Sequence, residues 1–217
     1  MQEFKYILFD LDGTLIDSGE GIINALKYAL QKFGIVEQDM NVLESFIGPP
    51  LKQRFKECYN FSNEECTKAV AYFREYYVPK GVFENRVYEG IPEVLKSLKA
   101  RGKKIMVATS KPEELAHKIL GQRGLRDYFD FIGGSLIDET RATKSEVLQY
   151  ILEANNLLED TSKTIMIGDT KYDIIGAKHF NLATIAVTYG YGSKEEMVNA
   201  GADYVVESAT ELLTKIK

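Results

Sequence analysis

Asp10-Leu11-Asp12-Gly13-Thr14 decides the fold, because this stretch directly follows the apolar run Tyr6-Ile7-Leu8-Phe9. Such a run is typical of a buried β-strand. Side chains two positions apart on a strand point the same way, so Asp10 and Asp12 are expected to face one place if the extended geometry continues. Gly13 then allows the chain to turn sharply. The plain alternative is a strand that ends in an acidic turn and carries no chemistry.

Two carboxylates in one place repel each other, so we expect the pKa of one to rise while the pKa of the other stays low. An ionised Asp10 could then attack an electrophile, and a partly protonated Asp12 could deliver or remove a proton. Alternatively, a divalent cation could hold both carboxylates together. The acidic pair by itself leaves both interpretations open.

The rest of the chain has two different patterns. Between positions 18 and 80, apolar residues recur at helical spacing with little sign of a strand, and Ser62 with Glu65 forms a capping-box pattern. Helices are expected there at 21–33, 40–46, 51–59 and 63–77. From residue 89 onward, expected strands alternate with expected helices. The strands are expected at 104–108, 129–133, 164–167, 183–187 and 204–206. The helices are expected at 91–100, 112–122, 145–155, 172–180, 195–200 and 210–216.

Repeated strand–helix units predict a parallel sheet covered by helices on both faces. The fold class is therefore α/β, a doubly wound Rossmann-like core with an inserted all-helical cap domain. We expect the core to comprise residues 1–17 and 83–217 and the cap to comprise residues 18–82. A length of 217 residues suits a core with one small additional domain.

Polar residues follow the strand expected at 104–108, and ligands of open α/β sheets bind at the carboxyl ends of the strands. Thr109 and Ser110 come first, and a helix is expected to begin directly after them, with Ser110 as its N-cap and Pro112 near its start. Hydroxyl groups together with the free N–H groups of a helix start bind anions. We therefore predict that Thr109 and Ser110 bind phosphate.

Three further charged residues are expected at the same edge of the sheet. Asp169 and Asp173 follow the strand expected at 164–167 and lie one helical turn apart. Lys144 precedes a helix, and its side chain supplies a mobile positive charge. With the acidic pair, these residues supply a nucleophile, an acid/base, phosphate donors, a cation and acids for Mg²⁺. Phosphoryl transfer requires this combination, since it depends on positioning and charge neutralisation.

With these motifs in this order, the chain resembles the haloacid dehalogenase superfamily phosphatases that carry a helical cap after their first motif. Asp10-Leu11-Asp12-Gly13-Thr14-Leu15-Ile16-Asp17-Ser18 resembles motif I, Thr109 resembles the motif II hydroxyl, Lys144 resembles the motif III lysine and Gly168-Asp169-Thr170-Lys171-Tyr172-Asp173 resembles motif IV. The branch it resembles within the superfamily contains phosphoglycolate phosphatases and 5′-nucleotidases.

The resemblance implies a role for each of these residues. Asp10 would form an aspartyl-phosphate, and Asp12 would act as general acid and then as general base. Mg²⁺ would be held by Asp10, by the backbone carbonyl of Asp12 and by Asp169, with Asp173 ordering waters or the lysine. The substrate would be a small phosphomonoester of the phosphoglycolate or nucleoside 5′-monophosphate type.

Three other functions use similar residues. A phosphomutase of the β-phosphoglucomutase type shares the motifs and differs in the acceptor. Receiver-like signalling modules also carry a phosphoacceptor Asp, a Thr and a Lys, but they are shorter and have no helical insertion after the first strand. A true haloacid dehalogenase needs the nucleophile but not Asp12 or the Mg²⁺ acids.

Composition narrows the expected partners. The net charge is −5 and basic residues are spread along the chain, which argues against nucleic acid or an anionic membrane as the partner. We expect no cleavable leader, and no apolar stretch of this sequence is long enough to cross a bilayer. Cys58 and Cys66 are expected to be free thiols in a reducing cytoplasm. We therefore expect a cytoplasmic protein that acts on a small phosphorylated metabolite. We expect it to be a monomer or a small homo-oligomer.

Overall fold

The computed structural model describes residues 3–137 and 140–217. Its core is a sheet of six parallel strands in the order β5-β4-β1-β6-β7-β8. The strands are β1 (Tyr6–Phe9), β4 (Lys104–Pro112), β5 (Phe131–Ser135), β6 (Thr164–Gly168), β7 (Ala183–Val187) and β8 (Tyr204–Val206). Because Phe9 pairs with Val107 on one side and with Ile167 on the other, the residue after β1 lies between the middle of β4 and the carboxyl end of β6.

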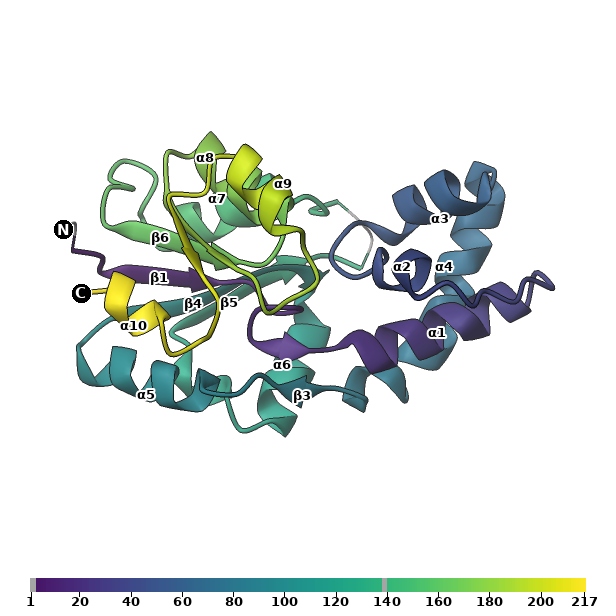
Figure 1. Ribbon diagram of the computed structural model, residues 1–217, viewed down its shortest axis with the longest axis horizontal. Coiled ribbons are helices and arrows are strands. Elements are labelled where there is room, and N and C mark those ends of the chain that lie inside the picture. The colour runs from purple at the N-terminus through teal and green to yellow at the C-terminus, as the bar shows by residue number, and fades with distance from the viewer. Residues whose placement is uncertain (1–2, 138–139) are drawn as a thin grey trace. The chain divides into compact units, whose positions relative to one another are not determined.

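Helices cover both faces of this sheet (Figure 1). One face carries α5 (Ile91–Ala100), α6 (Glu113–Gln122) and the short α10 (Leu212–Lys215), which packs against α5. The other face carries α7 (Lys144–Ala154) and α8 (Lys171–His179), with α9 (Lys194–Asn199) beside α8. The predicted α/β doubly wound architecture is confirmed.

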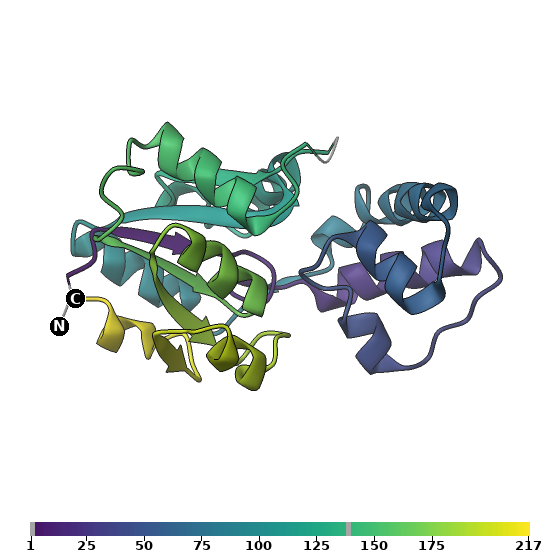
Figure 2. The ribbon, with the colours of Figure 1, turned by 90° about the horizontal axis from the view of Figure 1, so that it is seen from above.

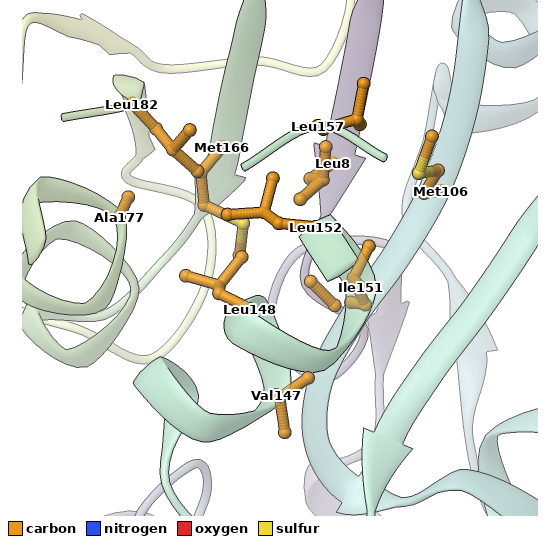
Figure 3. Close-up of a cluster of buried hydrophobic side chains, with 11 residues drawn as sticks. Leu8, Met106, Val147, Leu148, Ile151, Leu152, Leu157, Met166, Ala177 and Leu182 are labelled. Atoms are coloured by element: carbon orange, nitrogen blue, oxygen red, sulfur yellow. The ribbon is translucent and has the colours of Figure 1, made fainter. Parts of the chain in front are cut away.

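The packing of α7 on the sheet fixes one end of the site. Leu8, Met106 and Met166 are register partners on three neighbouring strands, so their side chains leave the same face of the sheet. There they pack against Leu148 and Leu152 of α7 (Figure 3). Burial of each leucine stabilises this contact by roughly 1.5–3 kcal/mol. The helix is therefore held firmly, and Lys144 is its first residue.

The second compact unit comprises residues 17–86. It contains α1 (Gly19–Gln31), α2 (Met40–Glu44), α3 (Leu51–Tyr59), α4 (Asn63–Tyr77) and the 3₁₀ turn η1 (Gly81–Phe83). Helix α4 packs against both α1 and α3 (Figure 2). Phe46, Phe55 and Phe73 are buried within the unit, which makes them part of its hydrophobic core.

The chain enters and leaves this unit through two short strands that the sequence did not predict. These strands, β2 (Ile16–Asp17) and β3 (Arg86–Val87), pair with each other. The guanidinium of Arg86 lies 2.7 Å from the carboxylate of Asp17 beside them. Each strand has only two residues, too few for a visible alternation of polar and apolar side chains.

Among the described residues, no helix is long and apolar enough to cross a membrane.

Local sequence patterns located most helices and strands correctly. The helices expected at 51–59, 63–77 and 91–100 have those bounds, and the capping box expected at Ser62 and Glu65 is formed. Thr143 and Glu146 form a second capping box at the start of α7. The strand expected at 129–133 instead spans Phe131–Ser135. Phe129 closes the 3₁₀ turn η2 (Arg126–Tyr128), since its N–H bonds to the carbonyl of Arg126, and the strand therefore starts later.

The helix expected at 112–122 is present and begins one residue later, but the prediction that Ser110 is its N-cap is wrong. Strand β4 continues through Pro112, which is the N-cap residue, and α6 begins at Glu113. A residue that precedes proline is sterically pushed away from helical geometry, which keeps Lys111 extended. The free N–H groups of α6 are therefore displaced along the chain from Thr109, and the expected N-cap role of Ser110 is not observed.

Candidate active site

Lys144 connects two acidic residues from different strand ends. Its Nζ atom lies 2.7 Å from Oδ1 of Asp10 and 2.7 Å from Oδ1 of Asp173, and it donates to the carbonyl of Ala108 over 2.8 Å. All three charged side chains are buried. Asp10 is held next to β6 by its own N–H, which donates to the carbonyl of Ile167 over 2.8 Å. The structure thus brings together Asp10, Lys144 and Asp173, as the sequence predicted for residues at one sheet edge.

Asp12 has a lysine of its own. The Nζ atom of Lys111, near the end of β4, lies 2.9 Å from Oδ2 of Asp12, and both side chains are buried. The other oxygen, Oδ1 of Asp12, is also buried, and no hydrogen-bond partner for it exists among the described residues. The two carboxylates of the acidic pair are therefore each neutralised by a different ammonium group.

Asp169 is fully buried and is held through both of its oxygens. The hydroxyl of Thr14 donates to Oδ1 over 3.2 Å, and the N–H of Tyr191 donates to Oδ2 over 2.9 Å. Gly13 is required beside it for space as well as for its φ of 82°, since a Cβ atom there would lie 2.1 Å from Oδ2 of Asp169. The turn after β1 and the carboxylate after β6 are thus in direct contact.

Asp173 lies in the first turn of α8 and stabilises the start of that helix. Its Oδ2 atom accepts hydrogen bonds from the backbone N–H and the hydroxyl of Thr170, over 3.0 Å and 2.8 Å. A Cβ atom at Gly168 would lie 2.2 Å from the Asp173 carboxyl carbon, so glycine is needed there too. With Oδ2 committed to the helix start, Oδ1 is the atom that meets Lys144.

The two hydroxyl residues predicted to bind phosphate have different surroundings. Thr109 is buried on β4, and its Oγ1 accepts the N–H of Lys111 over 3.1 Å. Ser110 is half-buried, and its side chain makes no hydrogen bond within 3–137 and 140–217. Alternation along a strand places Ser110 opposite Thr109 and Lys111. Phosphate binding by Thr109 and Ser110 stays a prediction.

Burial and crowding raise the pKa of the site carboxyls. The pKa of Asp10 is raised to about 6, chiefly by burial and further by Asp173 and Asp12, although Lys144 opposes the rise. The pKa of Asp169 is raised well above its usual range, first by burial and then by Asp173 and Asp10. Burial alone would lower the pKa of Lys144, but the two aspartates outweigh it and raise that pKa. Asp10 was expected to be the ionised member of the acidic pair, yet its pKa is raised. With a pKa of about 6, Asp10 is still mostly ionised at pH 7.

A divalent cation fits this cluster. Asp10, Asp169 and Asp173 each offer an oxygen atom, and these atoms lie within 4.8 Å of one another. Three buried carboxyl groups share the single positive charge of Lys144, so a divalent cation bound among them would favour their charged forms. Oxygen ligands from carboxylates are those that Mg²⁺ prefers. The predicted ligand set of Asp10, the backbone carbonyl of Asp12 and Asp169 stays a prediction. The carboxylate of Asp12, which that set does not use, meets Lys111.

Sequence reasoning missed two parts of the site. Lys111 had a signal, because it lies two residues after Thr109 on a strand and so shares its face. The segment Tyr189-Gly190-Tyr191-Gly192 also had a signal, since it follows the carboxyl end of β7 and is rich in glycine. There the backbone passes so close to Asp169 that a Cβ atom at Gly192 would lie 1.8 Å from the Asp169 carbonyl oxygen.

The chain is similar to known proteins along nearly its whole length. A 5′-nucleotidase of Pseudomonas aeruginosa is 43% identical over 194 residues, which cover 89% of this chain and 87% of the relative. A phosphoglycolate phosphatase of Vibrio parahaemolyticus is 31% identical, with 98% of this chain and 96% of the relative covered. The crystal structure of a predicted phosphatase from Clostridium acetobutylicum superposes with a TM-score of 0.94 at 50% identity, covering 99% of this chain and 98% of that one.

Residues 7–187, a range that includes Asp10, Lys111, Lys144 and Asp169, match the haloacid dehalogenase-like hydrolase family. The resemblance that the sequence motifs predicted is thereby confirmed. This chain belongs to the haloacid dehalogenase-like hydrolase family.

Proposed function

We propose that this protein is a Mg²⁺-dependent phosphatase that hydrolyses a small phosphomonoester through an aspartyl-phosphate on Asp10. The observation that carries the proposal is the contact between Asp10 and Lys144, 2.7 Å long and buried at the carboxyl edge of the sheet. A buried carboxylate beside a fixed ammonium is a nucleophile held where a phosphate group can be bound and its charge neutralised.

The reaction has two steps. In the first, an oxygen of Asp10 attacks phosphorus, the bond from phosphorus to the ester oxygen breaks, and Asp12 gives a proton to the departing alcohol. In the second, a water molecule attacks the same phosphorus and gives a proton to Asp12, and the bond to Asp10 breaks. Inorganic phosphate leaves, and both aspartates return to their starting protonation states. Asp12 thus acts as general acid and then as general base.

Each remaining site residue has a part in this scheme. Lys144 and Thr109 bind the phosphoryl oxygens, and Ser110 is a further candidate. Asp10, Asp169 and the backbone carbonyl of Asp12 would hold the cation, while Asp173 orders Lys144, which it contacts at 2.7 Å. When bound, Mg²⁺ lowers the negative charge of the carboxylates so that a phosphate dianion is able to approach Asp10.

The names of the relatives support the substrate class. Two of them are a 5′-nucleotidase and a phosphoglycolate phosphatase, both of which take their phosphate from a small molecule. We therefore place the substrate among small phosphomonoesters of these two types, with water as the acceptor. The same names favour hydrolysis over transfer to a sugar hydroxyl, which a phosphomutase would catalyse.

Release of inorganic phosphate from a panel of esters tests the proposal. The panel contains phosphoglycolate, nucleoside 5′-monophosphates and sugar phosphates, each assayed with Mg²⁺, with chelator, and with Mg²⁺ restored. We expect turnover of at least one ester that stops in chelator and returns with Mg²⁺. Ca²⁺ should substitute poorly, because it prefers more ligands at longer distances. Equal turnover in chelator would contradict the metal requirement, and no turnover of any ester would contradict the phosphatase assignment.

A further inference from the structure

We propose that Lys111 is the positioning residue for Asp12, so that each aspartate of the acidic pair is controlled by its own lysine. This inference rests on the proposed function, in which Asp12 moves the protons. Lys144 contacts Asp10 and Asp173, whereas Lys111 contacts Asp12. The two lysines come from different elements, α7 and β4, so the two aspartates are held independently.

The geometry shows how Lys111 controls the orientation of Asp12. The ammonium group lies 2.9 Å from Oδ2 of Asp12, in a pair whose side chains are 5% and 10% exposed. A short ion pair that is shielded from solvent restricts rotation of the Asp12 carboxylate, because rotation away from Lys111 would leave a buried charge unpaired. Oδ1, which is buried without a partner, is then the oxygen left to exchange a proton.

The backbone of β4 explains why Lys111 reaches this position. Strand geometry continues through Pro112, so Lys111 lies two residues beyond Thr109 on an extended chain. The N–H of Lys111 donates to Oγ1 of Thr109 over 3.1 Å, which ties the lysine to the residue proposed to bind phosphate. Had the helix begun after Ser110, the lysine would have been turned away by helical rotation.

A positioning role predicts an effect that depends on the leaving group. An alkyl phosphate needs a proton from Asp12 in the first step, while 4-nitrophenyl phosphate has a leaving group stable enough to depart without one. Both esters need Asp12 in the second step, when water attacks the aspartyl-phosphate. Loss of Lys111 should therefore spare aspartyl-phosphate formation from 4-nitrophenyl phosphate and slow its hydrolysis.

The experiment uses rapid mixing of Lys111→Met with 4-nitrophenyl phosphate. We expect a burst of nitrophenolate, then steady turnover roughly 10- to 100-fold slower than in the wild type, the cost typical of a displaced catalytic group. The fraction of enzyme phosphorylated on Asp10, measured after acid quench, should rise. With an alkyl phosphate the burst should be absent. Lys111→Arg, which keeps the positive charge, should restore part of the hydrolysis rate.

Two controls separate positioning from general damage. In an Asp12→Asn background, Lys111→Met should cause no further slowing, because the group it positions is already lost. Lys103 is a matched control, since it is also buried and lies just before the other end of β4. Lys103→Met should leave the phosphorylated fraction at the wild-type value.

Each contrary outcome has a distinct meaning. If Lys111→Met slows phosphorylation from both esters equally and has the same effect without Asp12, Lys111 acts on the phosphate or the fold, and the inference is overturned. If Lys111→Arg behaves like Lys111→Met and no phosphoenzyme accumulates in either, the inference is also overturned. If the wild-type protein forms no phosphoenzyme and releases no phosphate, the proposed function fails and this role of Lys111 falls with it.

Discussion

The N–H of Tyr191 donates to Oδ2 of Asp169 over 2.9 Å, which joins the loop after β7 to the carboxylate that follows β6. The same loop reaches the turn after β1, because the hydroxyl of Tyr189 donates to the carbonyl of Thr14 over 3.0 Å. Three consecutive strand ends in the sheet are therefore linked at Asp169. A carboxylate fixed in this way would already be oriented to bind the proposed cation.

Gly190→Ala should weaken Mg²⁺ binding. A Cβ atom at Gly190 would lie 2.4 Å from Oδ2 of Asp169 and 2.3 Å from the carbonyl oxygen of Gly13, so the carboxylate must move. Displacing a group that orients a metal ligand typically costs about 10- to 100-fold in affinity. Titration calorimetry with Mg²⁺ measures the change without any substrate. Gly121→Ala is the control, since nothing lies within 4 Å of its added Cβ. If the Mg²⁺ affinity of Gly190→Ala were unchanged, the loop after β7 would not contribute to metal binding.

Asp10→Asn should abolish turnover and leave the protein folded. The amide keeps the size of the side chain and removes the nucleophilic oxygen, while Lys144 retains Asp173 as a charged partner. We expect no phosphate release from any ester and no acid-stable label at position 10 in mass spectrometry. A melting temperature close to that of the wild type would show that the loss is chemical. Turnover near the wild-type rate would place the nucleophile elsewhere.

Lys144→Met should weaken all substrates alike. The substitution removes the ammonium that contacts Asp10 and Asp173 and, in the proposed scheme, the phosphate that every substrate shares. We expect kcat/KM to fall by roughly 10²-fold or more for two unlike esters, with their ratio unchanged. Lys178→Met provides the comparison, because Lys178 pairs with Asp203 at the surface, where both side chains are more than a third exposed. A changed ratio would mean that Lys144 contacts the leaving group.

Asp130→Asn should lower stability at neutral pH and lose its effect in acid. The Asp130 carboxylate is partly buried, which raises its pKa, but the N–H of Ile105 and the ammonium groups of Lys99 and Lys104 outweigh burial and hold that pKa below its ordinary value. A lowered pKa stabilises the folded state above the unfolded pKa of about 3.9, and this contribution disappears as pH falls through the folded value.

Denaturant unfolding of wild type and Asp130→Asn at several pH values measures that difference. The free energies of unfolding should differ at pH 7 and converge below about pH 4. Because the ammonium groups that pair with Asp130 belong to side chains that are 36% and 55% exposed, solvent screens both ion pairs, and the difference at pH 7 should not exceed about 1 kcal/mol. A gap that widened as pH fell would reverse the assigned direction of the pKa shift.

Local patterns along the chain were sufficient for the elements and for the edge on which the site lies. The apolar run before Asp10, the capping residues of α4 and α7 and the strand before Asp169 are visible in stretches of five to fifteen residues, because hydrophobic periodicity and helix capping are short-range effects. The start of α6 was misjudged, since Ser110 offered a cap and only the extended backbone before Pro112 excluded it.

The sequence by itself therefore determined the α/β class, the insertion and the acidic, hydroxyl and lysine residues at the strand ends. Only the tertiary structure decided which lysine side chain contacts which aspartate. Lys144 and Asp10 are 134 residues apart, and whether Lys144 or Lys111 contacts Asp10 depends on strand order and register. The same holds for the pKa increase on Asp10 and for the contact of Tyr191 with Asp169. Burial and through-space charge depend on distances in three dimensions, and spacing along the chain does not contain them.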